Sequence, residues 1–203
     1  PNPEESLSMA LVTFFDKNSA PALIDSSSLL LQQLLLPKQY GLQFVRSDLP
    51  HFFFKADENG QLTHSIFRYI NAFHANEPKV SVHLLQVINN ILLLPPSVFP
   101  YKVRANYFLM ILKLFFNYLS KVTISELHIP IISSIFLSFK KASSVIIREN
   151  KLNDSINQNP SKITHAALYD ELIVQFSQYT QFILENVHYY QYLESILEFW
   201  NHH

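Results

Sequence analysis

Residues 107–119 read YFLMILKLFFNYL, and this apolar stretch indicates how the chain is built. On a helical wheel, the helix that contains it leaves a narrow polar strip with Lys102, Asn106, Lys113 and Asn117. A helix that is apolar on nearly every side has to pack against neighbours on more than one side. We therefore expect an enclosed helix over residues 100–120 within a helical domain.

The composition favours helices over sheets. The 203 residues include two glycines and eleven prolines, and 15% of them are charged. Hairpin turns and phosphate-binding loops draw on glycine, so this composition argues against sandwiches, barrels and doubly wound sheets. The sequence contains no cysteine, which excludes disulfide scaffolds, thiolate metal sites and cysteine nucleophiles. An all-α fold is the class that remains.

Prolines and capping residues mark where the helices begin. Pro21, Pro78 and Pro100 suit a first helical turn, and Thr123 with Glu126 forms a capping box. We expect helices over residues 2–15, 19–36, 63–74, 78–94, 100–120, 123–148 with a bend at Pro130, and 161–200. Antiparallel helices joined by short turns predict a short α-solenoid of the HEAT or armadillo type, with a compact helical bundle as the alternative.

Two stretches bear on the organisation of the chain. Residues 48–60 fit either a helix that ends at Gly60 or a hairpin that turns at Asp57-Glu58-Asn59-Gly60. Residues 149–160 are polar and rich in asparagine, and we expect a loop there. We expect one all-helical domain over residues 1–203, and any subdivision of it to fall near residues 149–161. Because the chain begins with Pro1 and not with methionine, we expect it to be a fragment of a longer protein.

The polar residues do not form a recognisable catalytic motif. Nine histidines are present, but none forms the two-histidine motif with an intervening glutamate that zinc proteases use. Gly41 and Gly60 stand far apart, which excludes a glycine-rich phosphate loop, and the sequence has no G-x-S-x-G elbow. We expect no catalytic residues, no metal ligands, no cofactor and no small-molecule ligand.

Charge is unevenly distributed along the chain. Residues 102–162 hold nine Lys and Arg against three Asp and Glu, a net charge of +6, and residues 163–203 hold none against five, a net charge of −5. In one interpretation the two regions neutralise each other inside the fold. In the other, a basic patch contacts an acidic partner; its residues are Lys140, Lys141, Arg148 and Lys151.

Two apolar stripes run along the last helical region. The main stripe keeps spacings of three and four, and a break near Asn186 is expected; it comprises Leu168, Leu172, Phe176, Tyr179, Ile183, Val187, Tyr190, Leu193, Leu197 and Trp200. A second stripe lies on another face of the same region: Tyr189, Tyr192, Ile196 and Phe199. This second stripe either packs on an earlier helix, or meets a partner chain or the continuation of a longer parent protein.

The sequence therefore predicts a non-catalytic domain that binds another protein and acts as a scaffold. The expected contacts are the second aromatic stripe and, for an acidic partner, the basic patch. The alternative is a helical nucleic-acid-binding module that uses residues 102–162, although the chain is not basic overall. No apolar run reaches the length of a membrane span, and we expect an intracellular protein, in the cytoplasm or the nucleus.

Overall fold

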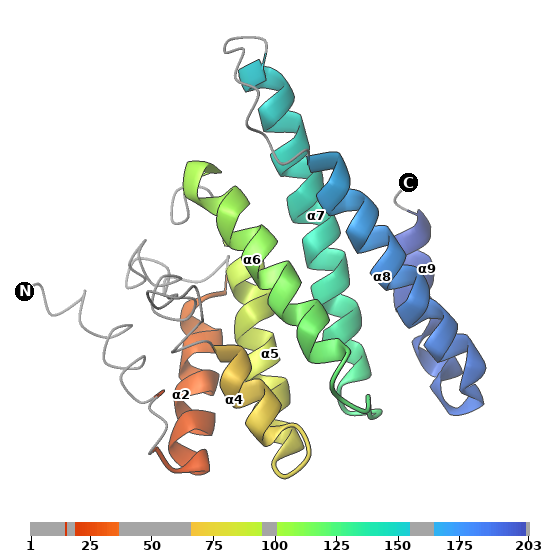
Figure 1. The fold of residues 1–203 in the computed structure, drawn as a ribbon. Coiled ribbons are helices and arrows are strands. Elements are labelled where there is room, and N and C mark those ends of the chain that lie inside the picture. The colour runs from red at the N-terminus through yellow and green to blue at the C-terminus, as the bar shows by residue number, and fades with distance from the viewer. Residues whose placement is uncertain (1–14, 16–18, 37–65, 95–100, 155–164, 202–203) are drawn as a thin grey trace, which may run out of the picture. The chain divides into compact units, whose positions relative to one another are not determined.

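The computed structural model describes residues 15, 19–36, 66–94, 101–154 and 165–201 (Figure 1). Their regular structure is helical throughout and includes no strand, which confirms the all-α class. The chain forms two compact units, Pro1–His128 and Ile129–His203. The predicted helix over residues 2–15 and both interpretations of residues 48–60 lie outside the described residues, apart from Phe15, which is not helical.

The first unit contains four described helices: α2 (Pro21–Leu34), α4 (Ile66–Phe73), α5 (Pro78–Leu92) and α6 (Tyr101–Leu119). Helix α5 packs against α2 and α4, and α4 also packs against α6. Proline occupies the first turn of α2 and of α5, as predicted, because the amide hydrogen that proline lacks would have no partner within the helix there.

Polar side chains hold α2 against α5. Asp25 Oδ1 lies 2.5 Å from His83 Nδ1, and Gln32 Nε2 donates to the His83 carbonyl at 2.9 Å. About two helical turns further along α5, Asn90 Nδ2 donates to the Gln32 carbonyl at 3.0 Å. Side chains that bond backbone carbonyls of the facing helix fix how the two helices align along their axes, which apolar contacts alone leave loose.

Helix α6 is enclosed on much of its surface. Lys113 and Asn117 are exposed, as the polar strip predicts. Among its described side chains, the buried ones are Phe108, Ile111, Leu112, Phe115 and Tyr118. These buried side chains lie on the side of the helix opposite the exposed Lys113 and Asn117, as a helix with one solvent-facing polar strip requires.

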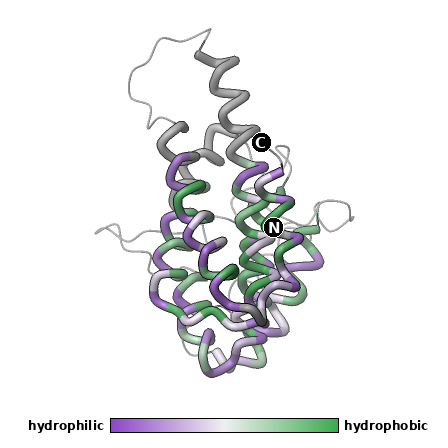
Figure 2. Tube along the Cα trace, turned by 90° about the vertical axis from the view of Figure 1, so that its right-hand side faces the viewer, coloured by the Kyte–Doolittle hydropathy of each residue, from purple (hydrophilic) through white to green (hydrophobic). Residues whose placement is uncertain are grey.

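The second unit contains α7 (Ile129–Asp154), α8 (His165–Glu185), the short 3₁₀ helix η2 (Val187–Tyr192) and α9 (Leu193–Asn201). Helix α7 packs against both α8 and α9, and η2 contacts both α8 and α9. Figure 2 shows hydrophobic and hydrophilic residues interspersed along the described helices, as expected for helices with one buried side.

Two predicted boundaries of α7 are wrong. The helix begins at Ile129 and not at Thr123, so Pro130 stands in its first turn and causes no bend within it. At its other end, α7 continues to Asp154 into the stretch predicted to be a loop, since residues 149–154 contain neither proline nor glycine to stop it. The boundary between the two units lies at the beginning of α7, away from residues 149–161.

We expect Phe115→Ala to lower the free energy of unfolding by about 3 to 5 kcal/mol, because it empties an aromatic-sized space around a fully buried ring. Phe116, half-buried on the same helix, is the matched control, and Phe116→Ala should cost roughly 1 kcal/mol. Urea unfolding measures both losses. Equal losses for the two variants would contradict the burial of α6.

Candidate functional site

The predicted site residues of the aromatic end lie on both sides of a helix break. Helix α8 ends at Glu185, and Asn186 adopts an extended backbone with φ −116° and ψ 97° before η2 begins. The Asn186 side chain donates to the Phe182 carbonyl at 2.7 Å and so satisfies an acceptor at the end of the helix. The break predicted near Asn186 is therefore confirmed.

The break changes which side of the chain faces the core. A 3₁₀ helix turns about 120° per residue where an α-helix turns about 100°, so the six residues of η2 rotate the following side chains by about 120° in total. Before the break, the main stripe is buried as predicted at Leu172, Phe176, Tyr179 and Ile183. After it, the predicted assignment of faces no longer holds.

The second stripe is largely core. Ile196 and Phe199 are 3% and 0% exposed, and the Phe199 ring stacks on Phe176 of α8 with the ring centroids 3.6 Å apart. Tyr189 and Tyr192 are half-buried, and Tyr189 lies 5.7 Å from the ring of Phe182. Packing within the chain is the alternative realised for Ile196 and Phe199, so these two residues offer no surface to a partner.

The main stripe is instead exposed beyond the break. Tyr190 and Leu197, predicted to continue the buried stripe, are 47% and 57% exposed. Trp200 is half-buried: its ring lies 5.6 Å from Phe176, and its Nε1 donates to Thr180 Oγ1 at 3.4 Å. The main stripe therefore does not continue the buried face predicted for it beyond the break, while Ile196 and Phe199 of the second stripe pack within the chain.

The basic patch loses one of its predicted members. Lys140 is buried; its ammonium donates to the Phe199 carbonyl and lies 4.5 Å from the centroid of the Phe199 ring. Burial lowers the pKa of Lys140 below its ordinary value. Lys141 is exposed, whereas the side chains of Arg148 and Lys151 are outside those that the structure describes. Lys140 therefore serves the packing of α7 on α9 and presents no charge to a partner.

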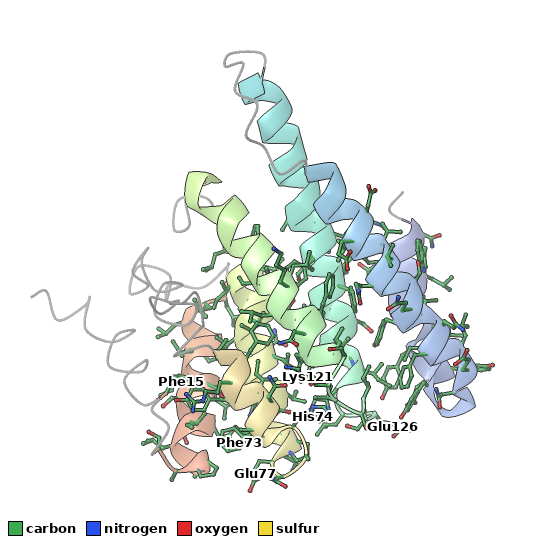
Figure 3. The ribbon with its side chains drawn as sticks, in the orientation of Figure 1. Phe15, Phe73, His74, Glu77, Lys121 and Glu126 are labelled. Atoms are coloured by element: carbon green, nitrogen blue, oxygen red, sulfur yellow. The ribbon has the colours of Figure 1, made fainter. Side chains whose placement is uncertain are left out.

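A pair of stacked histidines in the first unit was not predicted. The rings of His74 and His128 lie 4.2 Å apart at 31° to each other, and His74 also meets the Tyr118 ring edge-on at 5.5 Å. Figure 3 labels His74 beside the ends of α4 and α6, with Lys121 and Glu126 on the segment that follows α6. These histidines are 54 residues apart in the sequence, so no local spacing could have indicated the pair.

Hydrogen bonds account for all four ring nitrogens. His74 Nε2 lies 2.8 Å from the Thr123 carbonyl, which only accepts, so Nε2 carries the proton and Nδ1 accepts from the Tyr118 hydroxyl at 2.8 Å. Ser81 Oγ donates to the Pro78 carbonyl at 2.9 Å, so His128 Nε2 donates to Ser81 Oγ at 2.6 Å. His128 Nδ1 then accepts from Ser125 Oγ at 2.8 Å. One donating and one accepting nitrogen on each ring satisfy these four contacts.

The cluster fits a structural role better than a catalytic one. Ser81 and His128 are spaced like a nucleophile and its base, but Ser81 is fully buried and its proton is directed to Pro78. The second nitrogen of His128 bonds a serine, where a catalytic histidine is oriented by a carboxylate. What the cluster can do is join the α4–α5 corner to the segment between α6 and α7 and make that junction sensitive to protons.

The described residues contain no group of three or more His, Cys, Asp and Glu side chains that could hold a metal ion. No helix in the described part of the chain combines the length and the hydropathy that crossing a membrane requires. Comparison with known protein families, with curated proteins and with solved structures gave no match.

We expect mild acid to destabilise the first unit through His128. Burial, and secondarily the charge of His74, lower the pKa of His128 from 6.5 to about 4. In the unfolded chain, His128 takes up a proton below about pH 6.5, whereas in the folded chain it does so only near pH 4. The contribution of neutral His128 to the free energy of unfolding is therefore complete above pH 6.5 and is lost as the pH falls toward 4. The loss should be on the order of 2 to 3 kcal/mol.

Urea unfolding at a series of pH values between 7 and about 4 measures this effect. His128→Asn should flatten the pH dependence of the unfolding free energy, while Gln33→Asn, at an exposed position of α2, should leave it in place. A His128→Asn variant with an unchanged slope would show that the cluster does not carry the effect.

Proposed function

We propose that this chain is a non-catalytic helical domain that binds another protein and serves as a scaffold. The observation that carries the proposal is that large apolar side chains remain exposed on both units. The exposed set comprises Leu23, Leu29, Leu30, Leu93, Leu127, Val174, Leu184, Tyr190 and Leu197. Single exposed leucines are ordinary, but groups of them on one helix face mark binding surfaces.

Helix α2 presents such a group. Its exposed arc carries Leu23, Leu29 and Leu30 together with small or amide residues. Asp25 is the one charged residue of the helix, and it is engaged with His83. A surface helix is normally charged on its outer side. An uncharged outer face on α2 therefore supports a role in contact with another molecule.

The polar interior argues for a binding role over an enzymatic one. The most strongly perturbed side chains among the described residues are His128, Tyr118, Tyr179 and Lys140. Each is buried and has a hydrogen-bond partner within its own unit. Burial raises the pKa of Tyr118 and Tyr179 well above its ordinary value, so both phenols stay protonated and serve as donors.

The nucleic-acid alternative receives less support. A phosphate-binding surface needs several exposed cations, and Lys140, which the basic patch relied on, is buried against Phe199.

For the arrangement of the whole chain we propose the short α-solenoid, supported by the succession of helices that pack on neighbours within each unit. We further propose an intracellular location, supported by the absence of cysteine from the sequence.

The proposed function predicts that the immobilised chain retains a protein from a cell extract in a saturable way. Retention should fall by about tenfold or more when one exposed apolar group is replaced, as truncation of binding anchors does. Two double variants test the two units: Leu23→Ser with Leu30→Ser, and Leu184→Ser with Leu197→Ser. Gln33→Ser with Gln178→Ser, at exposed polar positions, is the control.

Circular dichroism and thermal unfolding should show that all three variants keep the fold. Loss of retention in either leucine variant, with the control unchanged, supports the proposal. Equal retention of the protein by all variants would contradict the proposal. So would the finding that the immobilised chain retains nucleic acid and that salt releases the nucleic acid and the protein together.

A further inference from the structure

We propose that the outer side of α8 and α9 binds a basic amphipathic helix of a partner protein. We call this surface the α8–α9 face and define it by Leu184, Tyr190 and Leu197 with Glu185, Glu194 and Glu198. The inference rests on the proposed function and names the partner's chemistry.

Two hydrogen bonds place the apolar residues of the α8–α9 face near one another. The two helices run in opposite directions (Figure 1), and Trp200 of α9 bonds Thr180 of α8 at 3.4 Å. Leu197 lies about one turn before Trp200 and Leu184 about one turn after Thr180, so the two leucines lie at a similar level. The Tyr190 hydroxyl donates to the Leu184 carbonyl at 3.3 Å, which places the end of the Tyr190 side chain beside Leu184.

All three apolar side chains are open to solvent. Leu184 is 50% exposed, and Tyr190 and Leu197 are exposed to a similar degree. The inner side of the same helices is already filled by the stacked rings of Phe176 and Phe199. No rearrangement of the core is therefore needed for these three side chains to be covered by another molecule.

The charged residues of α8 and α9 all have the same sign. Glu194 and Glu198 flank Leu197 on the exposed arc of α9, and Glu185 follows Leu184 at the end of α8. Residues 163–203 contain five carboxylates and no lysine or arginine. All five, including Asp170 and Glu171 of α8, are exposed, so no cation of this segment neutralises them.

Charge and apolar surface together specify the occupant. Acidic side chains beside exposed leucines repel anionic lipid surfaces and phosphates, which disfavours a membrane or a nucleic acid. A helix with leucines on one side and lysines or arginines along its flanks covers the apolar residues and pairs with the carboxylates. The apolar contact then supplies most of the affinity, and the charges supply association rate and specificity.

The probe is a synthetic amphipathic peptide of leucine and lysine, about 18 residues long, with leucines at helical spacing. We expect it to bind the full chain in a fluorescence anisotropy titration and to shift amide signals of α8 and α9. A scrambled peptide of the same composition, without an apolar face, should bind at least about tenfold more weakly.

Matched variants locate the contact. Leu197→Ser should weaken binding by about tenfold, because it removes one covered leucine. Leu30→Ser is the control, since Leu30 of α2 is 55% exposed and Leu197 is 57% exposed. Glu194→Gln with Glu198→Gln should weaken binding by roughly fivefold at low salt and reduce its salt dependence, while Glu77→Gln on the first unit should not.

Four outcomes overturn the inference: equal effects of Leu197→Ser and Leu30→Ser, equal binding of the scrambled peptide, binding of anionic vesicles in preference to the peptide, and self-association of the chain that Leu197→Ser abolishes. The last would make a second copy the occupant. If the Leu23→Ser and Leu30→Ser double variant alone loses the protein captured from an extract, the binding role stands and the α8–α9 face fails.

Discussion

The interruption of the helix at Asn186 determines which side chains of the last segment reach the core. One extended residue and one short 3₁₀ helix rotate everything that follows, so Ile196 and Phe199 of α9 are buried, α9 packs on α7, and Phe199 stacks on Phe176 of α8. The same rotation leaves Tyr190 and Leu197 facing outward. The core of the second unit and its exposed apolar surface are thus two consequences of one backbone feature.

The buried lysine follows from the same feature. Phe199 faces inward near the end of α9, and the buried Lys140 of α7 lies over its ring and donates to its backbone carbonyl. Lys140, which the sequence analysis placed in a surface patch, is therefore part of the interior of the second unit. The exposed charge of the second unit is shifted toward the acidic side as a result, which is the basis of the proposed preference for a basic partner.

Sequence patterns correctly predicted the features that depend on neighbouring residues, namely helix starts and the exposed and buried sides of single helices. Pro21 and Pro78 mark true helix starts, the polar strip of α6 is exposed, and the stripe of α8 is buried up to Ile183. Pro130 carried the same signal, but a stronger-looking capping box upstream masked it. Beyond Asn186 a constant turn of about 100° per residue fails, because the turn changes where the helix breaks. The His74–His128 pair depends on tertiary packing of distant segments, and no periodicity reports it.

The most direct test of this account is the reactivity of single cysteines placed on the two faces of α9. The chain has no native cysteine, so Leu197→Cys and Ile196→Cys each create one thiol. In native conditions, Leu197→Cys should react with a thiol reagent nearly as fast as it does in denaturant, while Ile196→Cys should react at least about a hundredfold more slowly. The reverse order, with residue 196 reactive and residue 197 protected, would contradict the rotation at Asn186 and the surface that depends on it.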